Sequence, residues 1–443
     1  MYVLVSRAFM LELLVDQVEH LPMMMTKEMI AVNAVHNSKE VSMKQGITVL
    51  ILSATILCLN GFIFASPIKE IPGFVWKRDL GNDKFDYESK AAAVSPTNGD
   101  LIITGQSVDY RNAQAPRNIY VWWVNGQGKT TKAITLKDSN GQGYFDVAAM
   151  SLLSSGEILL AAETQTHQKV IIKIDQDGKP LFTVPIAVAK DFEILLCRIV
   201  PLIDNKFIVI GYSTKSKGGA DGLIIKFDSL GHVLWRKTVS RSKIDWFWDG
   251  MATTDGGFTL VGNSGNYESG FVGSCNVWVT KFDGTGNAQS ETVFPGRFGR
   301  MTTSQEGGYV IAYDKDTYIN PDIRLQALSP ALQQKWGVHV LTTNKDFPRA
   351  PRMARTPAND FIVVGGKGGK ERIIGILWIK RIKSNGEVSW EFSADDSVKD
   401  STTALEYDLV SSNETFYVLY PNLIEVRSGG TRQKVRVIKF IQK

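Results

Sequence analysis

Cysteine and histidine are scarce in this chain. Its 443 residues include 3 Cys and 5 His, which excludes a disulfide-stapled scaffold and argues against a metal site built from Cys and His. Charge is also modest, because charged residues make up 21% and the formal net charge is +5. A surplus this small supports no argument for a nucleic-acid partner, and we expect none.

What the sequence does contain favours a large β protein. Apolar residues reach 44%, glycine is frequent at 39 residues and aromatics contribute 10%. That apolar fraction is enough to bury a core, and the length allows one large domain or two to three ordinary ones. Frequent glycine together with aromatic residues favours strands joined by tight turns over a bundle of helices.

One long apolar run stands near the N-terminus. It covers Ile47–Ala65, follows Met43-Lys44 and precedes Ser66-Pro67. A short basic start, an apolar stretch and a small residue before a polar break indicate a secretory signal over 43–65. The alternative is an uncleaved anchor, the only membrane contact that we expect, since a run of this length can just span a bilayer. Residues 1–42 are interpreted as a non-native upstream extension. The protein is therefore predicted to be secreted or periplasmic.

One segment recurs about every 50 residues. It consists of an apolar strand, a polar turn ending in Gly and a short strand that often ends in Trp. An apolar side chain stands four residues before each turn position. The copies are 120–128, 170–178, 223–235 and 278–286, with weaker copies at 324–336 and 378–390. The turn positions are Gly128, Gly178, Gly231, Gly286, Leu332 and Gly386.

Two more strands precede each copy, and four short strands per repeat are typical of a β-propeller blade. Counting the repeats gives seven blades over 71–443. The last repeat ends without a fourth strand, whereas Phe74–Lys77 matches such a strand and has no partner before it. We therefore predict an all-β, seven-bladed β-propeller of four-stranded blades. Its N-terminal strand completes the last blade and closes the ring, which removes exposed sheet edges.

The repeat resembles that of secreted bacterial β-propellers with PQQ-like repeats. The resemblance is clearest from Asp249 to Gly262 and from Lys226 to Trp235, and it extends over the whole chain after the signal. It implies that Trp235, Trp336 and Trp390 dock neighbouring blades. The vicinal cysteines and calcium ligands of the related quinoprotein dehydrogenases have no counterpart here, so neither a cofactor nor a metal is expected. These motifs are structural and imply fold more than function.

The loops predict where a site lies. In a four-stranded blade, the connections between blades share one face with those between the second and third strands. All the long connections of this sequence belong to that face, which we call the long-loop face. Tight turns such as 253–257 occupy the opposite, tight-turn face. Functional residues concentrate on irregular loops above a rigid scaffold, so the long-loop face is the predicted site.

Two groups of residues are predicted to bind a ligand there. Trp246 and Trp248 offer indole rings to a sugar or a protein. Guanidinium groups at the mouth of the central channel suit carboxylate, sulfate or phosphate. These arginines are Arg198, Arg297, Arg300, Arg349 and Arg352. The alternative is a neutralised rim network with Asp249, Glu193 and Asp346.

We therefore expect an exported, non-catalytic binding or scaffold protein that recognises a protein or an acidic polysaccharide. The alternative is an extracellular lyase or hydrolase acting on acidic glycans, with arginines holding sugar acids and an unassigned Tyr or carboxylate transferring protons. A carboxylate pair at the channel mouth would favour that enzyme. A third interpretation is a structural module of an envelope complex, which requires a flat hydrophobic face. The sequence assigns no catalytic residue.

Overall fold

The chain divides into two compact units, Met1–Ile68 and Lys69–Lys443, and the described residues belong to the second. The computed structural model describes residues 71–109, 111–112, 116–188, 192–215, 219–266, 275–315, 322–342, 351–368, 375–393, 407–425 and 431–442. The predicted extension at 1–42 and signal at 43–65 lie outside these ranges. Within them, no helix has both the length and the apolar character needed to cross a membrane.

The regular structure of the described ranges is β-strand arranged in antiparallel sheets of one repeating order. The first sheet consists of β2 (Phe85–Val94), β3 (Leu101–Asp109), β4 (Asn118–Val124) and β5 (Thr130–Thr135). The next consists of β6 (Tyr144–Leu152), β7 (Ile158–Thr164), β8 (Lys169–Ile174) and β9 (Pro180–Pro185).

Two further groups of four strands follow and are joined into one larger sheet by a parallel bridge between Ala220 and Ile244. The first group is β10 (Phe192–Pro201), β11 (Phe207–Lys215), β12 (Ala220–Phe227) and β13 (Val233–Val239). The second group is β14 (Ile244–Ala252), β15 (Phe258–Gly265), β16 (Cys275–Phe282) and β17 (Ala288–Pro295).

The C-terminal part repeats the pattern. One sheet is β18 (Arg297–Thr303), β19 (Tyr309–Asp314), β20 (Asp322–Leu328) and β21 (Gln334–Thr342). Another is β22 (Arg352–Arg355), β23 (Phe361–Gly368), β24 (Gly375–Ile382) and β25 (Val388–Ser393). The last sheet takes strands from both ends of the unit: β26 (Asp408–Ser412), β27 (Thr415–Glu425), β28 (Thr431–Ile441) and β1 (Phe74–Leu80).

Strand β1 is the outermost strand of that last sheet. It runs antiparallel to β28, and the register extends from Phe74 opposite Phe440 to Leu80 opposite Val435. The sequence prediction that Phe74–Lys77 pairs with the C-terminal strands is confirmed. Trp76 is 7% exposed and donates a hydrogen bond from Nε1 to the carbonyl oxygen of Gly126 in the first sheet, 2.9 Å away.

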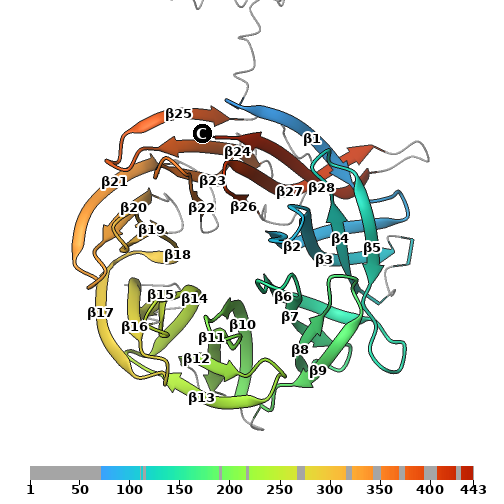
Figure 1. Cartoon of the computed structure of the whole chain (residues 1–443), viewed down its shortest axis with the longest axis horizontal. Helices are drawn as coiled ribbons and strands as arrows, with labels where there is room; N and C mark the ends of the chain where they lie inside the picture. Colours follow the sequence, from blue (N-terminus) through green and yellow to red (C-terminus); the bar gives the residue numbers. More distant parts are fainter. Residues whose placement is uncertain are drawn as a thin grey trace, which may run out of the picture. The chain divides into compact units, whose positions relative to one another are not determined.

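The sheets are arranged around a common centre, in the manner of a β-propeller (Figure 1). The first strand of each set lies innermost, and these strands contact one another in chain order: β2, β6, β10, β14, β18, β22 and β26. Strand β26 in turn contacts β2. Buried side chains of neighbouring sheets pack face to face, as Val121 of β4 and Leu160 of β7 do in one cluster. The all-β prediction is confirmed.

The recurring turn position has the backbone conformation that its glycine suggests. The φ angle is +79° at Gly128, +80° at Gly286 and +63° at Leu332, the one non-glycine copy. Only glycine adopts such angles without a steric cost. At Gly286 a Cβ would also lie 2.7 Å from the ring of Trp235, on the outer strand of the preceding sheet. Trp235 therefore packs between sheets, as the resemblance implies.

Candidate functional site

One register position recurs on all the innermost strands. Each residue at this position pairs with a residue on the second strand of its sheet. That partner lies three residues after the first buried residue of the second strand. Examples are the pairs Arg198–Ile210, Asp249–Val261 and Arg300–Ala312. We call the residues at this position the inner ring. They are Ala91, Ala149, Arg198, Asp249, Arg300, Arg352 and Asp408. Three of the predicted arginines thus occupy equivalent places around the centre.

The two aspartates of the inner ring join neighbouring strands. Asp249 accepts hydrogen bonds from the amides of Gly250 at 2.9 Å and Met301 at 3.1 Å, and Met301 lies on the next innermost strand. Asp408 repeats this geometry, because it accepts from the amide of its neighbour Leu409 and from that of Ala92 in the first sheet, each at 3.0 Å. Asp249, which begins the clearest copy of the sequence motif, therefore has a structural role.

Two inner-ring arginines have carboxylate partners. The Nε of Arg198 lies 3.3 Å from Oδ1 of Asp249, and the Arg198 side chain is 47% exposed. The Nε of Arg352 lies 3.6 Å from Oδ1 of Asp408 and donates to the carbonyl oxygen of Tyr407 at 3.2 Å. Of the predicted neutralising acids, Asp249 thus pairs with Arg198, while Asp346 lies outside the described residues.

Arg300 differs from both. Its Nη1 donates to the carbonyl oxygen of Trp248 at 2.5 Å, but its Nε is buried and finds no hydrogen-bond partner among the described residues. No described carboxylate lies within ion-pair distance of it. The pKa of Arg300 is lowered to about 9, mainly by burial and next by the nearby charge of Arg352, which Asp249 offsets only in part. Burial of a cation without an anionic partner costs free energy, so a bound anion would stabilise this position.

The structure separates the other two predicted arginines from this cluster. Arg297 is 5% exposed, and its Nη2 lies 2.9 Å from Oδ2 of Asp314, a carboxylate that is itself buried. Arg297 and Asp314 stand opposite each other in the β18–β19 register. Arg297 is thus held in an ion pair within one sheet. Arg349 lies outside the described residues.

The two predicted tryptophans belong to a half-buried aromatic cluster beside Arg300. The Trp246 and Trp248 ring centroids are 5.5 Å apart, and Tyr212 lies 5.2 Å from Trp246. On the other side, Phe298 lies 5.8 Å from Trp248. Neither tryptophan is fully exposed. The cluster therefore forms a wall next to the Arg300 guanidinium rather than a flat exposed platform.

A buried amide holds this wall in place. The Oδ1 of Asn263 accepts from the indole Nε1 of Trp248 at 2.7 Å and from the backbone amide of Phe298 at 3.0 Å. Phe298 has φ of +55°, which is rare for an aromatic residue. Strained backbone of this kind persists only where its surroundings fix it, and it is concentrated at functional sites. Sequence reasoning missed Asn263, because a single Asn in a strand gives no signal of its own.

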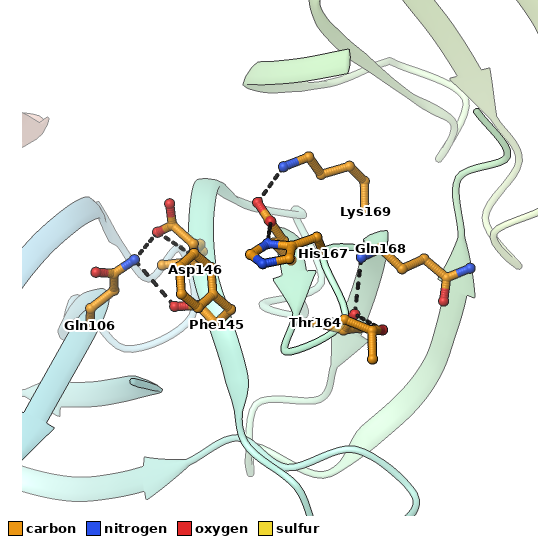
Figure 2. A network of polar contacts seen from close by, with 10 residues as sticks. Gln106, Phe145, Asp146, Thr164, His167, Gln168 and Lys169 are labelled. Atoms are coloured by element: carbon orange, nitrogen blue, oxygen red, sulfur yellow. Dashed lines mark hydrogen bonds and ion pairs between the residues drawn. The ribbon is translucent and has the colours of Figure 1, made fainter. Parts of the chain in front are cut away.

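A second group of polar side chains joins the first two sheets, with Gln106 on β3 and Asp146 on β6 (Figure 2). The amide of Gln106 donates to Asp146 and also to the carbonyl oxygen of Phe145 at 3.4 Å. Beyond Phe145, the Nδ1 of His167 lies 2.5 Å from Glu163, which also pairs with Lys169. Burial raises the pKa of Asp146 above its usual value, and the charge of Glu88 on β2 adds to the rise.

A hollow of about 640 Å³ lies on the tight-turn face, away from this site. It is bounded by the turns of the last and first sheets, including Asn98, Asn413 and Lys439. Its origin is the hairpin between β26 and β27, where Ser412 pairs directly with Thr415 and leaves a two-residue turn. Within the described ranges, no group of three or more His, Cys, Asp or Glu residues is placed to hold a metal ion.

Comparison with known proteins gives a likeness of fold only. No protein-family model and no curated protein matches the sequence, so a PQQ-like family is not supported at this level. A protein of unknown function from Dyadobacter fermentans DSM 18053 superimposes with a TM-score of 0.50 at 12% identity, covering 84% of this chain and 100% of that chain.

Two further solved structures are more distant. The β-propeller domain of the Trilobed protease from Pyrococcus furiosus gives a TM-score of 0.44 at 9% identity, with 80% of this chain and 95% of that one covered. A structure of puromycin hydrolase gives 0.47 at 11% identity, with 78% of this chain and 53% of that one covered.

Proposed function

We propose that residues 71–443 form a seven-bladed β-propeller, closed by β1, that is exported and binds an anionic ligand on its long-loop face without catalysing a reaction. The ligand class is a protein or an acidic polysaccharide. The pairing of β1 with β28 and the contact of β26 with β2 support the closed ring. The PQQ-like character of the repeats rests on the sequence motif and is part of this proposal.

One observation carries the proposed binding role. The guanidinium of Arg300 is buried beside Arg198 and Arg352, and its Nε has no partner among the described residues. If packing alone held the Arg300 side chain, the free-energy cost of burying its Nε without an acceptor would not be compensated. An anionic group of a ligand would supply the missing acceptor and charge, because guanidinium groups bind oxyanions strongly and remain charged at neutral pH.

The experiment is a binding screen on the full chain by thermal shift and glycan array, with uronic-acid and sulfated polymers. We expect a specific anionic hit that weakens as salt rises. The double variant Arg300→Ala/Arg352→Ala should lose that binding while its melting temperature stays close to wild type. Loss of folding in the double variant would mean that these arginines are structural. A negative screen followed by capture of a host envelope protein would favour the protein ligand.

The second candidate is an extracellular lyase or hydrolase on acidic glycans, and Asp146 is the observation that favours it. Asp146 and Glu88 lie on neighbouring innermost strands, and burial makes Asp146 a better proton donor near neutral pH than an ordinary carboxyl. In this scheme the arginines hold the sugar acid and Asp146 transfers the proton. Incubation of any bound polymer with the protein tests it: shortened products that disappear with Asp146→Asn would establish the enzyme, and intact polymer would exclude it for that substrate.

A further inference from the structure

The arginine cluster of the inner ring has a geometry that restricts what it can hold. Arg198, Arg300 and Arg352 stand at the same register position of β10, β18 and β22. They therefore lie at one level around the centre and do not form a line along the face. A chain of acidic sugars lying across the long-loop face would need cations spaced along its path, whereas cations at one level suit a single group.

The charged groups around Arg300, counted together with Arg300 itself, carry a net positive charge. The described charges nearest to it are Arg198, Arg352 and Asp249, and Asp249 already accepts two amide hydrogen bonds and pairs with Arg198. Asp408 is the partner of Arg352. Cys197 adds no negative charge at neutral pH, because burial raises the pKa of its thiol to about 12. Three guanidinium groups thus share two carboxylates in the described part of this cluster.

Two of the three arginines of the cluster are accessible to solvent. Arg198 is half exposed, Arg352 is 27% exposed, and Arg300 is buried with the Trp248 carbonyl oxygen fixing its Nη1. An approaching group meets Arg198 and Arg352 first and reaches Arg300 only if it is narrow. The aromatic wall of Trp248 and Phe298 borders the same place.

We propose that the inner-ring arginines hold one compact, singly charged oxyanion that enters end-on, namely the terminal or pendant sulfate ester or carboxylate of a ligand. This inference rests on the proposed function and narrows it. The ligand is recognised by one acidic group at the centre of the ring, and the remainder of the ligand extends outward over the long-loop face. A single surplus positive charge favours a monoanion over a phosphate dianion.

The test is isothermal titration of the full chain at constant ionic strength with methyl sulfate, acetate and inorganic phosphate. Polygalacturonate is then titrated with and without each small anion. Arg300→Gln and Arg198→Gln are compared with wild type. The matched control is Arg355→Gln, since Arg355 lies on β22 like Arg352 but donates to the carbonyl oxygen of Ser304 at 3.0 Å, toward the tight turns. Arg198→Gln changes a half-exposed side chain and keeps the test valid if Arg300→Gln fails to fold.

We expect methyl sulfate or acetate to bind, to compete with the polymer, and to lose at least about tenfold in affinity in both test variants but not in the control. Polymer binding that no small anion displaces and that survives both substitutions would overturn the end-on inference and leave the proposed binding role intact. Absence of binding by every small anion and by the polymer would overturn this inference together with the acidic-polysaccharide ligand, and would leave only the protein ligand of the proposed function. Tighter binding of phosphate than of methyl sulfate would overturn the assignment to a monoanion.

Discussion

The Oδ2 atom of Asp249 accepts a hydrogen bond from the backbone amide of Met301, 3.1 Å away on the innermost strand of the next sheet. The amide of Met301 is buried and therefore needs an acceptor, which Asp249 supplies. Asp408 and Ala92 repeat the relationship where the last sheet meets the first. The aspartates of the inner ring therefore fix the spacing of the innermost strands on which the arginines stand.

Replacement of Asp249 should destabilise the fold. Asp249→Ala leaves two buried amides without an acceptor and Arg198 without its carboxylate, so we expect a loss of about 1–3 kcal/mol or more in the free energy of unfolding by urea. Asp249→Asn keeps an acceptor and should lose less. Asp177→Ala is the control, because Asp177 makes an exposed ion pair with Lys132 and should change stability by less than about 0.5 kcal/mol. Equal losses for Asp177 and Asp249 would contradict the assigned role.

Two glycines in different turns of the β14–β17 group separate the cost of backbone strain from that of packing. Gly286 and Gly256 both have positive φ, +80° and +81°, but a Cβ would meet the Trp235 ring only at Gly286. Gly256→Ala should cost about 1–2 kcal/mol from the left-handed conformation alone. Gly286→Ala should cost distinctly more, because the Trp235 ring must move as well. Chemical denaturation measures both, and equal costs would mean that Trp235 adapts freely.

Two arginines on one strand should respond to substitution in opposite ways. Arg297→Met removes the ion-pair partner of the buried Asp314 carboxylate, whose Oδ1 still accepts from the amide of Asp322, and we expect a loss of about 3–5 kcal/mol. Arg300→Met removes a buried cation that lacks a carboxylate partner among the described residues, so stability without ligand should be unchanged or higher. Thermal unfolding of the two variants measures this contrast. A large loss for Arg300→Met would show that its main role is structural.

The stability of Asp146→Asn relative to wild type should depend on pH. The pKa of Asp146 is raised in the folded state, so the folded protein binds this proton more readily than the unfolded chain. Ionised Asp146 therefore costs stability at neutral pH, and the cost disappears once the pH falls below the ordinary Asp value of about 4. Asp146→Asn should be the more stable protein at about pH 7, with the difference shrinking toward about pH 3.

Glu163 serves as a comparison, because its pKa is shifted in the direction opposite to that of Asp146. Burial opposes its ionisation, but hydrogen bonds from Lys169 and His167 lower the pKa of Glu163 overall. Glu163→Gln should therefore be less stable than wild type at neutral pH, and this difference should also vanish in acid. Urea unfolding of both variants across that pH range is the measurement. Parallel pH profiles for Asp146→Asn and Glu163→Gln would contradict the assigned directions.

The strands and turns could be predicted because the sequence signals for them lie within each repeat. A glycine at positive φ, preceded at four residues by a buried apolar side chain, marks a hairpin without any knowledge of neighbours, and even Leu332 keeps the pattern through its own φ of +63°. The pairing of β1 with β28 followed from one strand that lacked a partner. Such signals depend only on residues within one hairpin or strand, so they can be recognised in a single sequence.

The site was predictable only in part, because its chemistry depends on contacts between sheets. Arg198, Arg300 and Arg352 were predicted at the mouth of the central channel, and they do share one register position, although Arg198 lies well inside β10. Charge alone could not distinguish Arg297 from Arg300, although Arg297 stands opposite Asp314 in one hairpin and Arg300 does not face an acid. Asp146 was missed because its partner Gln106 belongs to the preceding sheet, and the contact cannot be recognised from either strand alone. Arg349 and parts of several long connections lie outside the described residues.

The position of β1 in the last sheet has a consequence for the order of folding. Among the described strands, β1 is the first to leave the ribosome, and its partner is β28, the last of them. Until β28 emerges, β1 has no partner and its hydrogen-bonding groups are exposed as a free edge. The intermediate sheets can form as each hairpin is completed, but the last sheet, which holds Trp76 against Gly126, cannot form until β28 has emerged. The protein therefore acquires its final cooperativity in a single late step, and a chain truncated shortly before β28 should persist as an incomplete, aggregation-prone species.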